Sequence, residues 1–204
     1  MMQVAVVKYN AGNICSVINA LRRIGIDPLV TDSASELAAA DRIIFPGQGE
    51  AVNTMVYLHK NGLGDIIRGL RQPVLGICIG QQLLCTHSEE GHTPCLGIFD
   101  SCVCRFPTTS PAEGRIKVPQ IGWNTIEDLR SPLFDGLKNG DFVYFVHSFY
   151  VPDCADAIAH TTYGGVTYAS ALHKGNFYAT QFHPEKSGDT GLRILHNFIH
   201  LCHD

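Results

Sequence analysis

The chain has 204 residues, of which 45% are hydrophobic and 17% charged, a composition typical of a globular protein with a full core. The formal net charge is −4, and no run of Lys and Arg provides the basic face that nucleic-acid binding requires. No apolar run approaches the roughly 18 residues of a membrane span, and the N-terminal stretch lacks the basic lead-in of a signal peptide. We therefore expect a cytoplasmic protein that binds neither nucleic acid nor membranes.

The eight cysteines are spread along the chain without a paired pattern. With no export signal, reduced thiols are expected rather than a disulfide framework. Cys102 and Cys104 form a C-x-C pair, but no second pair follows at the spacing of a zinc site. No G-x-G-x-x-G or Walker pattern for a nucleotide occurs either. The sequence thus predicts neither a metal nor a cofactor.

The first part of the chain alternates short apolar runs with segments of helical periodicity. A stop signal, Gly25, follows the first of these helical segments. Strands that alternate with helices predict an α/β fold, with an open, mostly parallel sheet and helices on both of its faces. The runs that read as strands are 2–7, 42–45 and 73–78, and those that read as helices are 14–24, the segment after 50, 63–70 and the segment beginning at 81.

The second part of the chain is rich in β-branched and aromatic residues separated by turn glycines. Strands this close together leave no room for crossover helices, so they predict an antiparallel or mixed extension of the sheet. With no linker and no repeat, residues 1–204 are expected to form a single domain. The expected strands lie within 95–106, 143–151 and 165–183, a polar loop occupies 107–117, and an amphipathic helix closes the chain at 191–202.

Cys78 lies in the segment "GICIG", where the third apolar run meets the next helix. Small neighbours relieve crowding on a sharp strand-to-helix turn, as in the G-x-S-x-G turn of hydrolases. The free N–H groups and dipole at the start of the helix would stabilise a thiolate there. A buried core thiol explains "GICIG" equally well, so the assignment depends on a partner base.

His183 and Glu185 supply such a base in "FHPEKSG", directly after a predicted strand. Pro184 between them ends the strand and fixes the local backbone. A carboxylate on one imidazole nitrogen holds the tautomer and stabilises the charged ring. A polar surface turn is the alternative, and it is the better interpretation only if Cys78 is not a nucleophile.

Acyl transfer also needs donors for the developing oxyanion. One candidate is the backbone N–H of Ile79, the residue that follows the nucleophile. A second is the strand end "FPGQGE", which offers the N–H of Gln48 or Gly49, although an ordinary turn would have the same composition.

The segments "GICIGQQLL", "PGQG" and "HPEKSG" together resemble the class I (triad-type) glutamine amidotransferases, and the resemblance covers nearly the whole chain. It implies a triad that hydrolyses the side-chain amide of glutamine, with Cys78 as nucleophile, His183 as acid and base, and Glu185 as the orienting carboxylate. Gln82 would bind the glutamine backbone, with Glu90 near its amino group. The glutamine pocket would be completed by Gly47, His147, Ser148 and Phe149.

Three further segments, "KYNAGNICSV", "KVPQIGWNTI" and "YFVHSFY", resemble one subgroup of that family, the glutaminase subunits of imidazole glycerol phosphate synthase in histidine biosynthesis. That resemblance implies a heterodimer with a separate (β/α)₈-barrel cyclase, which receives the ammonia. It also implies that the isolated chain hydrolyses glutamine very slowly until the cyclase binds. The residues expected at the interface or in its regulation are Trp123, Asn124, Tyr144 and Lys186.

The sequence departs from the subgroup pattern at four positions. Gln48, Gln81, Gln120 and Phe149 stand where the subgroup usually has Val, Met, His and Tyr. A related glutaminase that serves sugar amidination keeps the same motifs and remains an alternative. A glutaminase for pyridoxal phosphate synthesis is disfavoured, because its G-G-E-S loop is absent. A non-catalytic or deglycase-like protein of related topology would lack the His–Pro–Glu segment.

Overall fold

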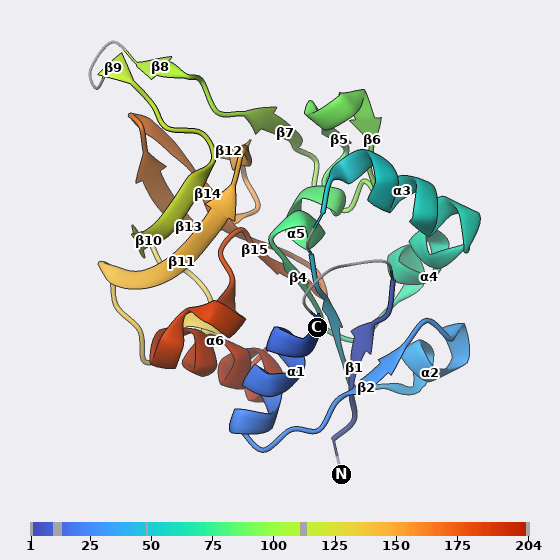
Figure 1. Ribbon diagram of the computed structural model, residues 1–204. Coiled ribbons are helices and arrows are strands. Elements are labelled where there is room, and N and C mark those ends of the chain that lie inside the picture. Colours follow the sequence, from blue (N-terminus) through green and yellow to red (C-terminus); the bar gives the residue numbers. More distant parts are fainter. Residues whose placement is uncertain (1, 10–13, 48, 111–113, 203–204) are drawn as a thin grey trace.

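The computed structural model describes residues 2–9, 14–47, 49–110 and 114–202. Its centre is one large mixed sheet whose strands follow the order β2-β1-β3-β4-β15-β14-β12-β7-β5-β6, with β13 paired to β14 (Figure 1). Neighbours from β2 to β15 run parallel, whereas β14 pairs antiparallel with β15, β12 and β13. This confirms the expected parallel sheet with an antiparallel extension.

The parallel strands are short and largely apolar, and β1, β4 and β15 are buried along their whole length, as is typical of a sheet covered by helices on both sides. In β1 all four residues are buried, with Val4 and Val6 in one core and Ala5 and Val7 in the other. The strands of this half are β1 (Val4–Val7), β2 (Leu29–Thr31), β3 (Arg42–Phe45), β4 (Val74–Ile77) and β15 (Phe177–Thr180).

Two helical layers cover the sheet (Figure 1). One core is formed with α2, α3, α4 and α5, and the other with α1 and α6. The first and last helices therefore pack their apolar sides against the same face of the sheet. The helices are α1 (Ile14–Arg23), α2 (Ala34–Ala39), α3 (Ala51–Lys60), α4 (Leu63–Gly69), α5 (Ile79–Leu83) and α6 (Gly188–His200).

The antiparallel part carries the remaining strands of the large sheet and two separate two-stranded ribbons, β8–β9 and β10–β11. In the ribbon β10–β11, Trp123 pairs with Tyr144 and Gln120 with His147. These strands are β5 (His87–Ser88), β6 (Thr93–Pro94), β7 (Cys102–Arg105), β8 (Thr109–Ser110), β9 (Gly114–Arg115), β10 (Gln120–Ile126), β11 (Asp141–His147), β12 (Phe149–Pro152), β13 (Ala157–Tyr163) and β14 (Val166–Lys174). Short 3₁₀ turns η1, η2 and η3 occupy Glu90–His92, Pro132–Phe134 and Pro184–Lys186.

Three local expectations were wrong. Within 95–106 only β7 is extended, because the preceding residues bond back to the end of α5, where Leu84 O accepts from two amides. The segment 107–117 contains the paired strands β8 and β9 rather than a plain loop. The helix expected from residue 81 begins at Ile79 and ends at Leu83, so its first turn follows the cysteine immediately.

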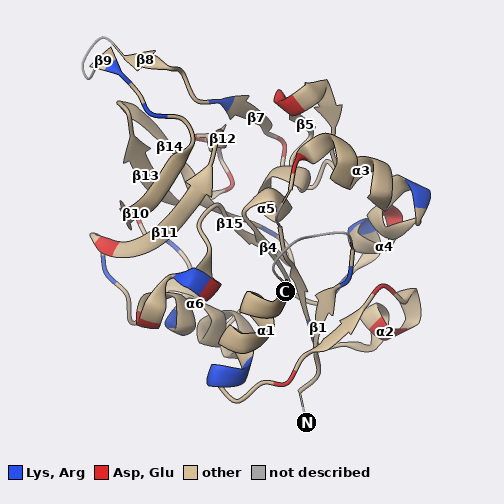
Figure 2. Cartoon of the chain, viewed as in Figure 1, with Lys and Arg blue, Asp and Glu red and all other residues tan. Residues whose placement is uncertain are grey.

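Charged residues are spread over many elements (Figure 2). The fold nevertheless brings Arg105 beside Arg115 and Lys117, and these three cations line one hollow of about 390 Å³. No sequence pattern indicated this group. Among the residues that the structure describes, no helix has the length and apolar character needed to cross a membrane.

Candidate active site

Cys78 sits on a strained turn between β4 and α5. Its backbone φ is +54° and ψ is −108°, a region that non-glycine residues rarely adopt. The turn is held because the Cys78 amide donates to Thr180 O of the neighbouring strand at 2.7 Å. The side chain is only 8% exposed, and its sulfur faces the cavity described below. This conformation favours the predicted nucleophile over an ordinary core thiol.

Glycine flanks Cys78 because the turn is packed directly against backbone. A Cβ at Gly80 would lie 2.4 Å from Phe45 O, at the end of β3. A Cβ at Gly47 would lie 2.4 Å from the Gly80 nitrogen. The "PGQG" loop and the cysteine turn thus touch through two glycines. Gly47, expected to contact substrate, instead provides this close packing and does not line the cavity.

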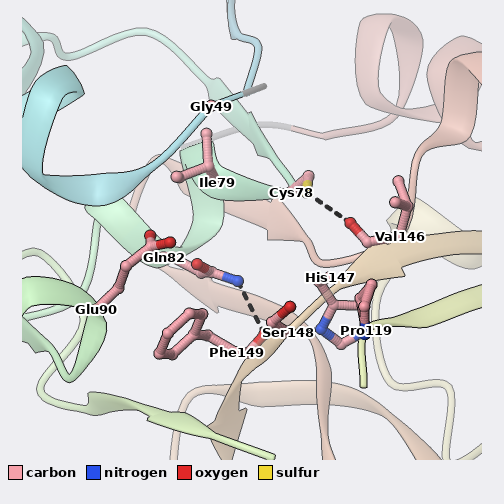
Figure 3. Close-up of a pocket in the computed structure, with 10 residues that line it drawn as sticks. All are labelled: Gly49, Cys78, Ile79, Gln82, Glu90, Pro119, Val146, His147, Ser148 and Phe149. Atoms are coloured by element: carbon pink, nitrogen blue, oxygen red, sulfur yellow. Dashed lines mark hydrogen bonds between the residues drawn. The ribbon is translucent and has the colours of Figure 1, made fainter. Parts of the chain in front are cut away.

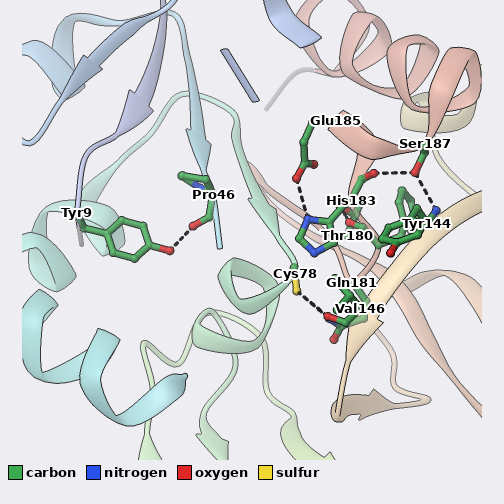
Figure 4. Close-up of polar contacts among 11 residues, drawn as sticks. Tyr9, Pro46, Cys78, Tyr144, Val146, Thr180, Gln181, His183, Glu185 and Ser187 are labelled. Atoms are coloured by element: carbon green, nitrogen blue, oxygen red, sulfur yellow. Dashed lines mark hydrogen bonds and ion pairs between the residues drawn. The ribbon is translucent and has the colours of Figure 1, made fainter. Parts of the chain in front are cut away.

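His183 and Glu185 form a buried pair beside Cys78 (Figure 4). The ring nitrogen Nδ1 of His183 lies 2.7 Å from Glu185 Oε1, and the two side chains are 1% and 3% exposed. The His183 amide donates to Tyr144 O at 2.9 Å, which ties the histidine to β11. The other ring nitrogen, Nε2, points toward Cys78 and has no hydrogen-bond partner among the described residues.

The charge state of His183 follows from three opposing effects. Burial lowers its pKa, but the negative charge of Cys78 and the contact with the Glu185 carboxylate outweigh burial and raise the pKa above the ordinary value. The site therefore favours the imidazolium form of His183, which places a proton donor beside the sulfur of Cys78.

The Cys78 sulfur has two further polar neighbours. Val146 O accepts from the thiol at 3.8 Å, and Gln181 Nε2 donates to the sulfur at 3.7 Å. Val146 belongs to the antiparallel ribbon β10–β11 and Gln181 directly follows the parallel strand β15, so the site lies where the parallel sheet meets that extension.

A cavity of about 220 Å³ opens above Cys78 (Figure 3). Most of the predicted substrate residues surround it, together with two that the sequence did not single out, Pro119 and Val146. The lining comprises Gly49, Cys78, Ile79, Gln82, Glu90, Pro119, Val146, His147, Ser148 and Phe149.

Gln82 donates both of its side-chain amide hydrogens to groups within the protein. Its Nε2 donates to Phe149 O and to Gln181 Oε1, each at 2.9 Å. An amide nitrogen has two hydrogens, so the oxygen Oε1 is the atom left for a ligand. At the cavity wall, Gln82 can therefore accept a hydrogen bond from substrate but has no N–H left to donate.

Glu90 reaches the cavity from η1, and one carboxylate oxygen accepts from the Ala51 amide at 2.7 Å. This bond lies at the start of α3, where a negative charge is favourable. Burial raises the pKa of Glu90, the Ala51 amide lowers it, and the nearby Glu50 raises it further, with a net increase. The second carboxylate oxygen is the group that can meet a substrate amine.

His147 lines the cavity without a free ring nitrogen. Its Nδ1 donates to Phe149 O at 2.7 Å, and its Nε2 lies 3.2 Å from the Tyr168 hydroxyl. That hydroxyl also lies 3.0 Å from Gln120 Oε1 and has one hydrogen for these two acceptors. Burial lowers the pKa of His147 to about 4, despite the bond to Phe149 and with His183 adding to the decrease. His147 is thus a neutral support of the wall rather than a second proton carrier.

The structure describes two of the three expected oxyanion donors, Ile79 and Gly49. Ile79 lines the cavity at the first position of α5, where helix N–H groups have no internal partner. Gly49 also lines the cavity with φ of +127°, a conformation open to glycine. Gln48 lies outside the described residues. The Tyr9 hydroxyl donates to Pro46 O and so anchors the start of this loop (Figure 4).

The residues expected at an interface do not all share one face. Trp123 is 56% exposed and lies edge-on to Tyr144 at 5.9 Å. Ile121 and Phe142 are similarly exposed, at 56% and 57%, on the same side of the ribbon. Asn124 points the other way, since its amide donates to Thr162 O.

Lys186 lies on η3, directly after Glu185, and is partly exposed. No group of three or more His, Cys, Asp or Glu residues within the described ranges is arranged to hold a metal ion.

Sequence reasoning missed two contributors to the site. Gln181 is fully buried against Cys78, and the only sequence signal was its place two residues before His183. Val146 contacts the sulfur through its backbone, which side-chain identity cannot signal.

A family model described as glutamine amidotransferase class-I matches residues 5–202. The chain belongs to this family. It is 56% identical over 200 residues to the imidazole glycerol phosphate synthase subunit HisH of Bacteroides fragilis, across 98% of this chain and 100% of that protein. It is 41% identical to the subunit of the same name from Methanosarcina mazei, across 99% of this chain and 100% of that protein. The HisH protein of Acinetobacter baylyi is 40% identical, with 98% of each chain covered.

These full-length identities place the chain, within its family, among the HisH subunits of imidazole glycerol phosphate synthase, as its motifs predicted. Solved structures agree on the fold. A glutamine amidotransferase superposes with a TM-score of 0.70 at 20% identity, covering 95% of this chain and 98% of that one. The structure of PurLQS from Thermotoga maritima gives 0.70 at 18% identity, covering 97% of both chains.

Proposed function

We propose that this chain is the glutaminase subunit of imidazole glycerol phosphate synthase and hydrolyses L-glutamine to glutamate and ammonia. The observation that carries the proposal is the buried His183–Glu185 pair beside the strained Cys78, which lines a small cavity. Family membership and the HisH relatives support the same reaction. Cys78, His183 and Glu185 act as the triad, and the whole chain acts as one glutaminase unit.

In the first half-reaction, His183 Nε2 takes the Cys78 proton, and the thiolate attacks the side-chain amide carbon of glutamine. A C–S bond forms, and the carbonyl oxygen becomes an oxyanion that meets the N–H of Ile79 and a donor of the "PGQG" loop. The imidazolium then gives its proton to the amide nitrogen. The C–N bond breaks, ammonia leaves, and a glutamyl thioester remains on Cys78.

In the second half-reaction, neutral His183 takes a proton from water, and the hydroxide attacks the thioester carbon. The C–S bond breaks, glutamate leaves, and the thiolate returns beside the imidazolium. Glu185 holds Nδ1 throughout and so keeps Nε2 aimed at the reacting atoms. The Oε1 atom of Gln82 and the second oxygen of Glu90 receive the substrate amine at the cavity wall.

A separate (β/α)₈-barrel cyclase receives the ammonia and docks on the exposed side of the ribbon β10–β11. Large apolar side chains rarely stand this exposed in a group without a partner. Ile121, Trp123 and Phe142 form that group, and Val146 on the same ribbon contacts the Cys78 sulfur. A partner on this ribbon lies next to the nucleophile. Tyr144 under Trp123 and Lys186 on η3 complete the surface.

The test uses an electrophilic glutamine analogue and the complex of this chain with its cyclase. We expect covalent mass on the peptide that holds Cys78, and loss of both labelling and glutamine turnover in Cys78→Ala. The control is Cys102→Ala, which removes an exposed thiol on β7, away from the cavity, and is expected to retain turnover. Turnover in folded Cys78→Ala, or labelling of another residue, would contradict the triad.

A further inference from the structure

The buried side chain of Gln181 contacts the reacting sulfur. We propose that Gln181 is a catalytic residue, whose amide N–H stabilises the Cys78 thiolate while Gln82 fixes the direction of that amide. Two side-chain amides then connect the glutamine cavity to the nucleophile. The inference deepens the proposed function and rests on it, because it assumes that Cys78 reacts as a thiolate.

Gln181 is held firmly in place. It is 0% exposed, and its backbone N–H donates to Ser170 O at 2.9 Å. The preceding residue, Thr180, accepts from the Cys78 amide at 2.7 Å. The backbones that carry the amide side chain and the sulfur are thus hydrogen-bonded neighbours. The 3.7 Å contact between Gln181 Nε2 and the Cys78 sulfur therefore follows from the pairing of the two strands.

Hydrogen-bond polarity fixes which end of the Gln181 amide meets the sulfur. Gln82 Nε2 donates to Gln181 Oε1, so the Gln181 nitrogen is the end that faces Cys78. Gln82 is itself fixed, because its second amide hydrogen goes to Phe149 O, and a carbonyl can only accept. The direction therefore runs from the Phe149 carbonyl through two amides to the sulfur.

The sulfur lies between two groups with opposite preferences. Val146 O, at 3.8 Å, accepts a hydrogen bond and therefore favours the neutral thiol. Gln181 Nε2, at 3.7 Å, donates and therefore favours the thiolate. In a site this buried, a donor beside the charged form has more effect than the same donor in water. Without the Gln181 amide, the Val146 carbonyl remains beside the sulfur, and it favours the neutral thiol.

Substrate binding can act on this chain of amides. The cavity atom of Gln82 is its oxygen, since both of its amide hydrogens are used internally. A substrate amine that donates to this oxygen polarises the Gln82 amide, and the polarised N–H binds Gln181 more strongly. The binding of substrate in the cavity then affects the reactive sulfur without any movement of the backbone.

The test compares Gln181→Met and Gln181→Glu with the parent chain, alone and in complex with its cyclase. The first variant keeps the approximate volume and removes both polar ends. The second keeps an acceptor for Gln82 but places oxygen, instead of N–H, against the sulfur. We measure the rate of Cys78 alkylation by iodoacetamide between pH 5 and 10 by peptide mass spectrometry, and steady-state glutamine turnover.

We expect the midpoint of the alkylation profile to move to higher pH by about one unit or more in both Gln181 variants. We expect kcat to fall about tenfold or more, with KM within about threefold of the parent value. Gln82→Met leaves Gln181 in place but removes its orienting donor, so a smaller shift in the same direction is expected, together with a higher KM.

The matched control is Gln81→Met. Gln81 is also 0% exposed and lies on the same helix as Gln82, but its amide donates to Ala169 O at 3.3 Å, away from the sulfur. It should alter thermal stability and leave the alkylation midpoint in place. A folded Gln181→Met or Gln181→Glu variant with the parent midpoint and kcat would overturn the inference. Failure of the parent Cys78 to react with a glutamine analogue would instead overturn the triad.

Discussion

Replacing Glu185 by glutamine isolates the effect of one buried negative charge. The parent carboxylate lies 2.7 Å from His183 Nδ1, both side chains are almost fully buried, and Oε2 has no partner among the described residues. The glutamine side chain would keep the shape and an oxygen that accepts from Nδ1. The substitution therefore removes charge while leaving the orientation of the imidazole largely intact.

The size of the effect follows from the strength of that contact. A hydrogen bond to a charged group contributes about 1.5–3 kcal/mol, against about 0.5–1.5 kcal/mol for a neutral pair. The difference is roughly 1–1.5 kcal/mol, which corresponds to about a tenfold decrease in kcat. Removing the base itself in His183→Ala should decrease kcat by about 10²–10⁴ or more. Glu185→Gln is thus expected to be clearly the milder variant.

The pH profile gives a second, independent signature. The carboxylate is one of the groups that raise the pKa of His183, so its removal should lower that pKa. The imidazolium donates the proton to the leaving nitrogen, and it would then be lost at lower pH. The alkaline limb of kcat against pH should consequently move toward lower pH in Glu185→Gln.

The assay is glutamine turnover of the complex with cyclase between pH 6 and 10, with circular dichroism to confirm folding. Asp65→Asn serves as control, because it removes a carboxylate that is 82% exposed on α4 and should change neither quantity. Folded Glu185→Gln that is as inactive as His183→Ala would refute the modest size assigned to the charge of Glu185. An alkaline limb that stays in place would refute the electrostatic argument.

Three other predictions test the packing of the turn, the loop and the partner surface. Gly80→Ala places a methyl group 2.4 Å from Phe45 O, so we expect the free energy of unfolding to decrease by about 1–3 kcal/mol, with a lower melting temperature and loss of Cys78 labelling; a parent-like melting curve would count against that contact. Gly49→Pro removes an N–H and requires φ near −65° where the parent has +127°, so activation of turnover by cyclase should be lost while binding persists. A fully active isolated parent chain, indifferent to cyclase, would remove the regulatory part of this prediction. Trp123→Ala should weaken cyclase binding by roughly 2 kcal/mol, or about 30-fold in Kd by titration calorimetry, and an unchanged Kd would place the interface elsewhere.

The sequence determined the features that depend on local order. Apolar runs such as 74–77 are buried strands because every side chain in them is apolar, and a central parallel strand is covered on both faces. "GICIG" and "HPE" predicted a turn cysteine and a histidine with an adjacent carboxylate, because these relations span only two or three residues. The bond between His183 and Glu185 is such a relation.

The tertiary structure decided what depends on contacts between distant segments. Gln181 meets Cys78 across 103 positions because β15 pairs with β4, and no pattern within either segment encodes that approach. Gly47 proved to be a packing residue because the cysteine turn approaches its backbone from another strand.

His147 shows the same limit for chemistry. The family resemblance implied a substrate contact, but the fold places polar partners beside both of its nitrogens and, by burial, lowers its pKa to about 4. Residue type is written in the sequence, whereas burial and hydrogen-bond partners, which set what a side chain can do, arise only when distant strands are brought together.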